Sequence, residues 1–208
     1  MARYTGSVCK LCRRERQKLY LKGNRCSSSK CSVDKRPYPP GEHGRGRIRE
    51  TQYMIQLREK QKARRIYGVL EKQFRRYYRE AAQAKGITGE RLLQILETRL
   101  DNVVFRAKLA NSRSQARQFV SHGHFTVNGR RVNVPSYRVR PGDVVALKER
   151  SRSLVAVQHA LDTSGDRMSP DWLDLNQEDR AITVSDLPSR AQIDIPVQEQ
   201  LIVELYSK

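Results

Sequence analysis

Apolar residues recur every three or four positions through residues 50–122, a spacing typical of helices that each bury one face. Gly68, Gly86 and Gly123 each follow the last periodic position of a segment and can adopt the left-handed conformation that ends a helix. Ser112 can cap a helix, with Gln115 three residues beyond it as in a capping box. The pattern therefore predicts helices over residues 50–67, 70–85, 89–96, 100–107 and 113–122.

The period changes from helical to alternating after residue 122. Asn128-Gly129 is a strong two-residue hairpin signal between two short alternating runs. Residues 151–195 are acidic and less regular, with Trp172 and Leu173 as expected core anchors, and residues 200–206 are apolar enough to dock. The predicted strands cover residues 125–127, 130–132, 138–140 and 144–147, and alternation continues through Ile193, Ile195 and Val197.

Composition and charge point to a polyanionic partner. Hydrophobic residues make up 38% of the 208-residue chain, so we expect a modest core in one or two domains. The formal net charge of +19 is uneven: +16 over residues 1–80, +8 over residues 81–150 and −5 over residues 151–208. Because like charges repel one another, the first two thirds of the chain are expected to lie against a polyanion.

The sequence has no pattern typical of a membrane-spanning segment or of a catalytic site. No apolar run approaches the roughly 18 residues needed to cross a bilayer, and the start lacks the apolar core of a signal peptide, which predicts a cytoplasmic protein. There is no Ser-His-Asp order with supporting context and no acidic cluster in the basic part. Lone histidines such as His43 and His159 are more typical of surface or packing positions. We therefore expect that the chain is not an enzyme.

Four cysteines lie within the first 31 residues. Cys9 and Cys12 form a C-x2-C pair, and Cys26 and Cys31 follow after a gap of thirteen as a C-x4-C pair. Four thiolates at this spacing suit tetrahedral zinc, and in a cytosolic setting disulfides are less expected. Because the surrounding segment has scarcely any apolar core, a metal would supply its folding energy. We expect one structural zinc ion; an iron–sulfur cluster and free thiols remain the alternatives.

Prolines and glycines interrupt residues 36–47, which predicts an extended or turning arm. The glycine spacing faintly resembles a phosphate loop, but Arg47-Ile48 stands where Lys and Ser or Thr should be, and no predicted strand precedes it. Tyr38 and the arginines of the arm favour contact along an RNA backbone. A flexible basic linker that orders only on binding is the alternative.

The first two predicted helices are strongly basic. In the helix over residues 50–67, the cations are too many and too spread for one salt-bridged face. Tyrosines in the next helix could stack on bases, but aromatic residues at helical spacing more often belong to a core. The cations of the first helix are Arg58, Lys60, Lys62, Arg64 and Arg65, and the tyrosines of the second are Tyr77 and Tyr78.

A further cationic cluster lies between Arg99 and Asn128. Arg113 and Arg117 are one helical turn apart and are expected to project together, with His122 and His124 at the helix exit. A helix start adds free N–H groups and a partial positive charge, so a phosphate near Ser112 would meet donors and charge together. The alternative is a solvated polar face on an ordinary helical hairpin.

Long motifs extend over the whole chain and read MARYTGSVCKLCRRE, RPYPPGEHG, RLDNVVFR, SRSQARQFVSHGHFTVNGRRVN and PVQEQLIVELYSK. Together they resemble the S4 family of small-subunit ribosomal proteins, and residues 99–147 resemble its RNA-binding module. The resemblance implies an α+β fold: a helical N-terminal domain with a four-cysteine zinc knuckle, and an inserted S4-type domain with a helix pair on a small antiparallel sheet. The implied parts are a knuckle and basic arm (1–45), a helical domain (46–97) on which residues 197–208 pack back, and the S4 domain (98–196).

The resemblance also implies a function, namely a structural constituent of the small (30S) subunit that binds 16S rRNA and nucleates assembly of the subunit body. With the fifth small-subunit protein it would contribute to translational accuracy. Expected partners are 16S rRNA, the third and fifth small-subunit proteins and, in some bacteria, its own mRNA; the chain would be a monomer within the ribosome. The residues expected to contact RNA are Arg13, Arg14, Lys22, Arg36, Tyr38, Arg45, Arg47, Arg58, Lys62, Arg65, Arg75, Arg76, Arg106, Ser112, Arg113, Arg117, His122, His124, Arg130 and Arg131.

Two other classes of protein remain open at the level of sequence. One is a free-standing RNA-binding regulator or assembly factor that carries the same module. The other is a zinc-dependent DNA-binding protein. Against DNA, the sequence has no clear recognition helix with Asn, Gln and Arg directed at a major groove, and no dimerisation heptads.

Overall fold

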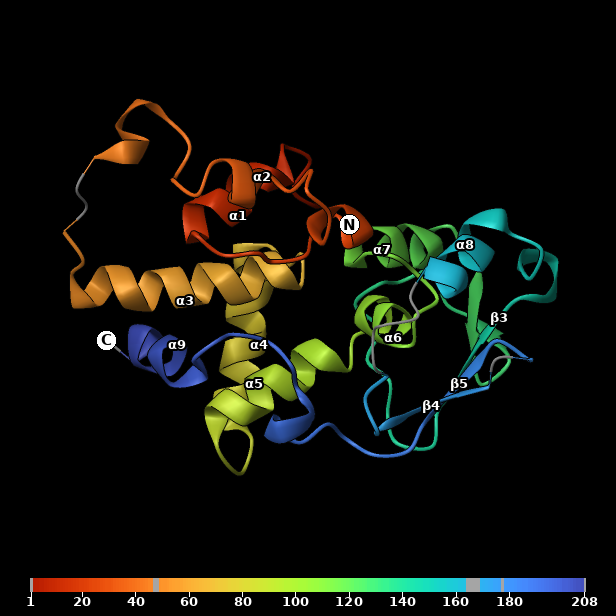
Figure 1. Ribbon diagram of the computed structural model, residues 1–208. Coiled ribbons are helices and arrows are strands. Elements are labelled where there is room, and N and C mark those ends of the chain that lie inside the picture. Colours follow the sequence, from red (N-terminus) through yellow and green to blue (C-terminus); the bar gives the residue numbers. More distant parts are fainter. Residues whose placement is uncertain (1, 47–48, 164–168, 177, 208) are drawn as a thin grey trace. The chain divides into compact units, whose positions relative to one another are not determined.

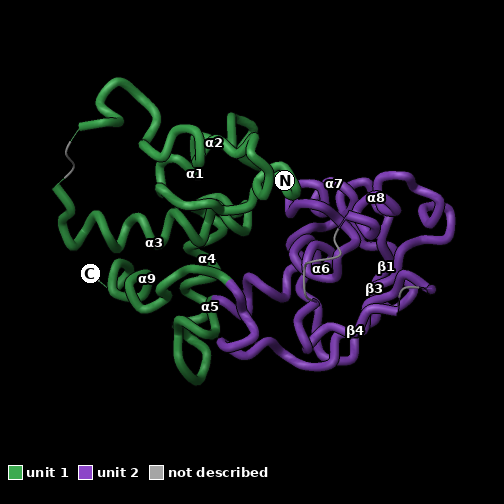
Figure 2. The backbone as a smooth tube through the Cα atoms, in the orientation of Figure 1, with its two compact units in different colours: residues 1–92, 195–208 green, residues 93–194 purple. Residues whose placement is uncertain are grey.

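The computed structural model describes residues 2–46, 49–163, 169–176 and 178–207. The chain forms two compact units: unit 1 comprises residues 1–92 and 195–208, and unit 2 comprises residues 93–194 (Figure 2). Unit 2 is thus inserted within the chain of unit 1. The expected α+β class is confirmed, because the described chain combines helices with an antiparallel sheet. No described helix is long and apolar enough to cross a membrane.

Unit 1 is helical, and its longer helices begin and end close to the predicted positions. Thr51 caps α3 by accepting a hydrogen bond from the Met54 amide, and Gly68 follows α3 with φ of +64°. Helix α5 starts in this unit and continues into unit 2. The elements of unit 1 are α1 (Val8–Glu15), η1 (Gly23–Cys26), α2 (Ser32–Lys35), η2 (Glu42–Arg45), α3 (Gln52–Ile66), α4 (Glu71–Gln83), the start of α5 (Thr88–Glu97) and α9 (Glu199–Tyr206).

The C-terminal helix α9 completes unit 1 by packing along α3 (Figure 1). Gln56 of α3 donates from Nε2 to Glu204 Oε2 at 2.9 Å, although 148 residues separate the two in sequence. The Tyr206 ring stacks on Tyr78 with centroids 4.5 Å apart, and its hydroxyl donates to Glu71 Oε1 at 2.9 Å. Burial, together with this hydrogen bond to a carboxylate, raises the pKa of Tyr206. The aromatic residues of α4 therefore serve the core.

The cations of α3 are ion-paired within unit 1, contrary to the expectation that they are too spread for a salt-bridged face. Glu15 of α1 contacts Arg58 at 3.5 Å and also Arg65. The remaining pairs are Lys60 with Glu71 at 2.9 Å, Lys62 with Glu59 at 2.5 Å and Arg64 with Glu71 at 2.5 Å. The sequence pattern was misleading because Glu15 and Glu71 belong to other helices, which the fold brings against α3.

Unit 2 contains helices α6 (Leu100–Arg106), α7 (Arg113–Ser121) and α8 (Val155–Thr163) and a five-stranded antiparallel sheet. The strand order is β2-β1-β3-β5-β4, and Phe125 of β1 lies opposite Leu147 of β3. Trp172 and Leu173 are buried in the core, as expected. The other elements are β1 (Phe125–Val127), β2 (Arg130–Arg131), β3 (Val144–Leu147), η3 (Glu149–Ser151), β4 (Leu173–Asn176), β5 (Ala181–Val184) and η4 (Arg190–Gln192).

Three features of unit 2 and of the segment that follows it differ from the structure predicted from the sequence. Residues 138–140 form no strand, and the β-pairing of Arg138 is an isolated bridge with Arg99. The segment thought to be less regular contributes α8, β4 and β5. Its strands are stabilised by the sheet, because β5 pairs with β3 and β4 pairs with β5, and α8 packs on the core through Val157. Residues 193–197 alternate between buried and exposed as predicted, but they lie in no strand.

Replacing Tyr206 with Phe tests whether α9 holds unit 1 together. The change keeps the stacked ring but removes the hydroxyl that donates to Glu71. We expect a loss of about 1.5–3 kcal/mol in the free energy of unfolding, the range for a hydrogen bond to a charged group, measured by urea denaturation. Tyr53→Phe is the matched control because Tyr53 is 59% exposed. Equal stability of the two variants would contradict the role assigned to the hydroxyl.

Candidate nucleic-acid interface and cysteine centre

The four cysteines lie along one small cavity in unit 1. Helix α1 carries Cys9 and Cys12 three residues apart, η1 ends at Cys26, and Cys31 directly precedes α2. Three of the thiols are buried, and Cys9 is partly exposed. The Lys22 amide donates to Cys26 Sγ at 3.4 Å. Burial raises the pKa of the Cys12 and Cys26 thiols.

The four cysteine sulfur atoms around this cavity are suitable ligands for a metal ion such as zinc, but their side chains are not arranged as a preformed metal site. Four sulfur atoms are ligands that zinc prefers, and amide N–H groups directed at sulfur stabilise a thiolate. Within the described part of the chain, however, no three His, Cys, Asp or Glu side chains are arranged to hold an ion as they stand. The four cysteines form no disulfide bonds. The zinc expected from the sequence thus stays a prediction.

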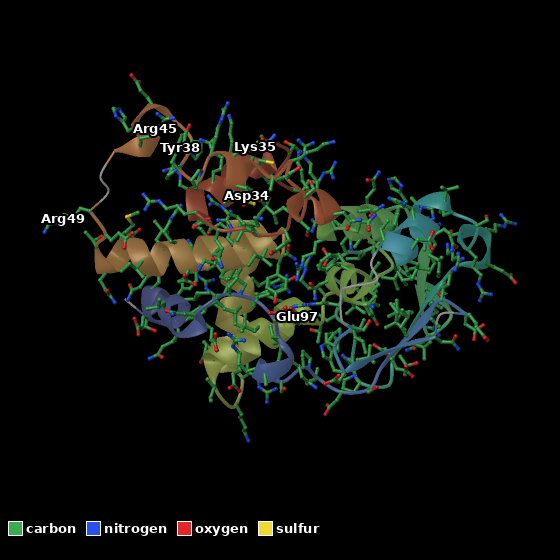
Figure 3. The ribbon with its side chains drawn as sticks, viewed as in Figure 1. Asp34, Lys35, Tyr38, Arg45, Arg49 and Glu97 are labelled. Atoms are coloured by element: carbon green, nitrogen blue, oxygen red, sulfur yellow. The ribbon has the colours of Figure 1, made fainter. Side chains whose placement is uncertain are left out.

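The basic arm is folded onto α1. Arg13 donates from Nε to the Tyr38 carbonyl at 3.0 Å, and its guanidinium lies 5.1 Å from the centroid of the Tyr38 ring. Arg45 lies 4.7 Å from the centroid of the same ring and donates to its hydroxyl at 3.3 Å (Figure 3). A Cβ on Gly44 would lie 2.0 Å from the Pro39 carbonyl oxygen, so only glycine fits this close turn. These contacts hold residues 38–45 of the arm against α1.

The residues expected to contact RNA fall into two groups. The first group is exposed to solvent, although Arg14 and Arg45 also contact Pro40 and Tyr38 of the arm. The second group is partly or fully buried within its own unit. Arg47 lies outside the described residues. The exposed positions are Arg14, Lys22, Arg36, Arg45, Arg75, Arg76, His122, Arg130 and Arg131. The partly or fully buried positions are Arg13, Tyr38, Arg58, Lys62, Arg65, Arg106, Ser112, Arg113, Arg117 and His124.

The start and end of α7 have the local structure that the sequence predicts. Ser112 accepts a hydrogen bond from the Gln115 amide at 3.3 Å, so it is the N-cap. The Gln115 side chain accepts from the Asn111 amide at 2.7 Å, one residue earlier than in a standard capping box. Gly123 follows α7 with φ of +74°. Since the Arg131 guanidinium lies beside Gly123, strand β2 is next to the exit of this helix.

A buried ion network joins α6 to α7. Arg99 is fully buried and donates from Nε and Nη2 to the two oxygens of Asp101, at 3.0 and 2.6 Å. Arg117 is 8% exposed and donates from Nη1 to Asp101 Oδ2 at 3.2 Å. The expectation that Arg117 projects with Arg113 onto an outer face is therefore wrong. Position 117 faces α6, because α7 packs on that helix.

A second buried carboxylate organises the other arginines of this region. Glu97 accepts from Arg106 Nε and Nη2 at 3.0 and 2.7 Å, and from Asn102 Nδ2 at 2.6 Å. Asn102 in turn accepts from Arg113 Nε at 2.8 Å, and the Arg113 guanidinium lies 4.4 Å from the centroid of the Phe105 ring. These contacts hold Arg113 in one orientation while leaving the side chain partly exposed.

The two histidines at the exit of α7 are not equivalent. His122 is exposed, whereas His124 is partly buried and shares a 2.9 Å hydrogen bond between Nδ1 and Ser151 Oγ. Burial, with the nearby His122 and Lys148, lowers the pKa of His124. This shift disfavours the cationic form of His124, and its contact with RNA stays a prediction.

Sequence reasoning missed the carboxylates that arrange this cluster. Glu97 and Asp101 are the only acidic residues between Arg91 and Gly142, they are four positions apart, and both are buried. Two neighbouring acids within a long cationic stretch are a signal for ion pairs rather than for a solvated cationic face.

Comparisons with known proteins agree along the whole chain. The family described as ribosomal protein S4/S9 N-terminal domain matches residues 3–97, and the S4 domain family matches residues 98–145. A protein of Pelotomaculum thermopropionicum called small ribosomal subunit protein uS4 is 59% identical over 208 residues, covering all of both chains. Proteins of the same name from Acidothermus cellulolyticus and Dictyoglomus turgidum are 62% and 58% identical, again over the full length of both chains.

Asp101→Asn tests the buried network of unit 2. The change keeps the shape of the side chain but removes the charge shared by Arg99 and Arg117. We expect the free energy of unfolding to fall by about 3 kcal/mol, because removing one partner of a buried ion pair leaves its charge uncompensated. Thermal or urea denaturation measures the loss. Asp174→Asn, at an exposed position of β4, is the matched control. If both changes lowered the free energy of unfolding by a similar small amount, the buried network would not contribute to stability as proposed.

Proposed function

This chain belongs to the uS4 family of small ribosomal subunit proteins, and we propose that it is a structural, RNA-binding component of the small subunit in the cytoplasm rather than an enzyme. The observation that carries the proposal is similarity to uS4 proteins over the whole chain, through both the N-terminal domain and the S4 domain. Charge supports it independently, since the chain carries a formal net charge of +19.

The mechanism of RNA binding is mainly electrostatic. Arg75 and Arg76 are exposed on α4 of unit 1, and Arg130 and Arg131 are exposed on β2 of unit 2. Contacts between such cations and phosphates release counterions, which gives affinity without sequence specificity. Specificity then comes from the fixed positions of the cations, because folded RNA is recognised largely by shape. The structured arm and the oriented Arg113 are examples of such fixed positions.

The finer assignment follows the family resemblance. The chain would bind 16S rRNA as a monomer and nucleate assembly of the subunit body, with the third and fifth small-subunit proteins as neighbours. Its contribution to translational accuracy would depend on the fifth protein, and its own mRNA would be a further RNA partner in some bacteria.

Sedimentation of a cell lysate through a sucrose gradient tests the ribosomal role. We expect the chain to migrate with small subunits and to remain with them through a wash at moderate salt. A peak at the top of the gradient, with binding of purified chain to small-subunit rRNA retained, would favour a regulator that acts away from the ribosome. Equal binding to rRNA and duplex DNA at the same salt concentration would overturn the RNA-binding proposal itself.

The exposed arginines can be tested with purified 16S rRNA. In Arg130→Ala/Arg131→Ala, we expect weaker binding and a slope of log affinity against log salt concentration that is smaller by about 0.7–0.9 for each phosphate that is no longer bound. The control Asp171→Asn/Asp174→Asn also changes two exposed charges of unit 2 and should not weaken binding. An unchanged slope in the arginine variant would remove β2 from the interface.

We further propose that Cys9, Cys12, Cys26 and Cys31 hold one structural zinc ion. Their common cavity and the amide that donates to Cys26 support the proposal. Zinc would draw the four thiols together as thiolates and supply folding energy to a segment with few apolar residues. Because all four ligands are protein sulfur atoms, such a site is closed and has no position for a reactive water.

Metal removal tests the zinc site. We expect purified chain to contain one zinc ion per molecule, and Cys9→Ser/Cys12→Ser or a strong chelator to disorder residues 2–46 while unit 2 stays folded. Amide NMR spectra report both regions, and added zinc but not magnesium should restore the chelated sample. An unchanged spectrum for residues 2–46 after complete metal removal would refute the structural role, and iron with sulfide in place of zinc would identify a cluster.

A further inference from the structure

The turn between β1 and β2 contains the one Asn-Gly pair of the chain. Asn128 and Gly129 both have positive φ, 49° and 78°, as a tight two-residue hairpin of the I′ kind requires. Both residues are exposed, and a Cβ added to Gly129 would contact nothing within 4 Å. Water therefore reaches this turn freely.

An asparagine followed by glycine is chemically labile, because glycine has no side chain to obstruct attack by its own amide nitrogen. The Gly129 nitrogen forms a bond with Asn128 Cγ and loses its proton, and the Cγ–Nδ2 bond breaks with release of ammonia. Water then opens the resulting succinimide ring to give aspartate or isoaspartate. For this reaction the Asn128 amide must turn toward the Gly129 nitrogen.

In the fold, the side-chain amide of Asn128 is held by hydrogen bonds to Asp143 and Val144. Asn128 Nδ2 donates to Asp143 Oδ1 at 2.8 Å, and Asn128 Oδ1 accepts from the Val144 amide at 2.8 Å. The Asn128 main-chain amide also donates to the Val144 carbonyl at 2.9 Å. Asp143 is itself fixed, because its Oδ2 accepts from the Arg140 amide at 2.8 Å. Both polar atoms of the labile side chain are thus engaged.

We propose that Asn128 is a site of spontaneous deamidation and that its hydrogen bonds to Asp143 and Val144 restrain the reaction in the folded chain. The product would carry a carboxylate where Nδ2 now donates to Asp143, so two like charges would meet between the turn and the start of β3. Isoaspartate would in addition lengthen the main chain within a turn that fixes the pairing of Val127 with Arg130. Deamidation therefore marks and damages chains that have spent time unfolded.

Peptide mass spectrometry after incubation at mildly alkaline pH tests the proposal on the full chain. We expect conversion at Asn128 to be slow in the folded wild-type protein and much faster in urea. In folded Asp143→Ala, conversion should be faster than in folded wild type by about tenfold, the change in population when one charge-assisted hydrogen bond is removed. Equal rates for the folded and unfolded wild type, or an unchanged rate in the variant, would overturn the proposal.

The control is Asp179→Ala, which removes a similar bond from Asn176 Nδ2 to Asp179 Oδ2 at 3.1 Å and should leave the rate at Asn128 unchanged. Where Asp143→Ala does not fold, Asp143→Asn keeps the size of the side chain and should give a smaller acceleration. The mimic Asn128→Asp should lower the melting temperature, and Asn128→Asp/Asp143→Asn should recover most of the loss. If Asn128→Asp had the same melting temperature as the wild type, the proposal that deamidation destabilises the fold would be refuted.

Discussion

Carboxylates shared between two cationic or polar donors are the interaction on which both units depend. The first 150 residues carry a large excess of positive charge, so helices packed in a small core would bring guanidinium groups together at a high electrostatic cost. Each shared carboxylate offsets this repulsion and joins segments that are separate in sequence. The pairs are Glu15 with Arg58 and Arg65, Glu71 with Lys60 and Arg64, Asp101 with Arg99 and Arg117, and Glu97 with Arg106 and Asn102.

This pairing divides the cations into two populations with different roles. Arg117 and Arg99 stabilise unit 2 from within, whereas Arg75, Arg76 and Arg130 remain on the surface. The surface population carries the charge available to a polyanion, and the internal population fixes where the surface charges lie. RNA recognition by shape requires both, because mobile charges would bind any nucleic acid equally.

Much of this organisation followed from the sequence. Helical periodicity and glycines located α3, α4, α5 and α7, and the Asn128-Gly129 signal located the hairpin of β1 and β2. The long motifs indicated the family, which full-length similarity then established. Local signals succeed here because caps, left-handed glycines and two-residue turns depend on neighbours in sequence.

The amino-acid sequence by itself therefore determined the fold class, helices α3 to α7, the hairpin and the cationic character of the chain. Only the tertiary structure decided which cations face outward. Arg113 and Arg117 look alike in sequence, yet one is partly exposed and stacked on Phe105 while the other is buried against Asp101. Strands β4 and β5 likewise depend on strand pairing, because β5 pairs with β3 and β4 pairs with β5. The physical reason is that ion pairs and strand ladders are contacts between distant segments, and periodicity within one segment does not record them.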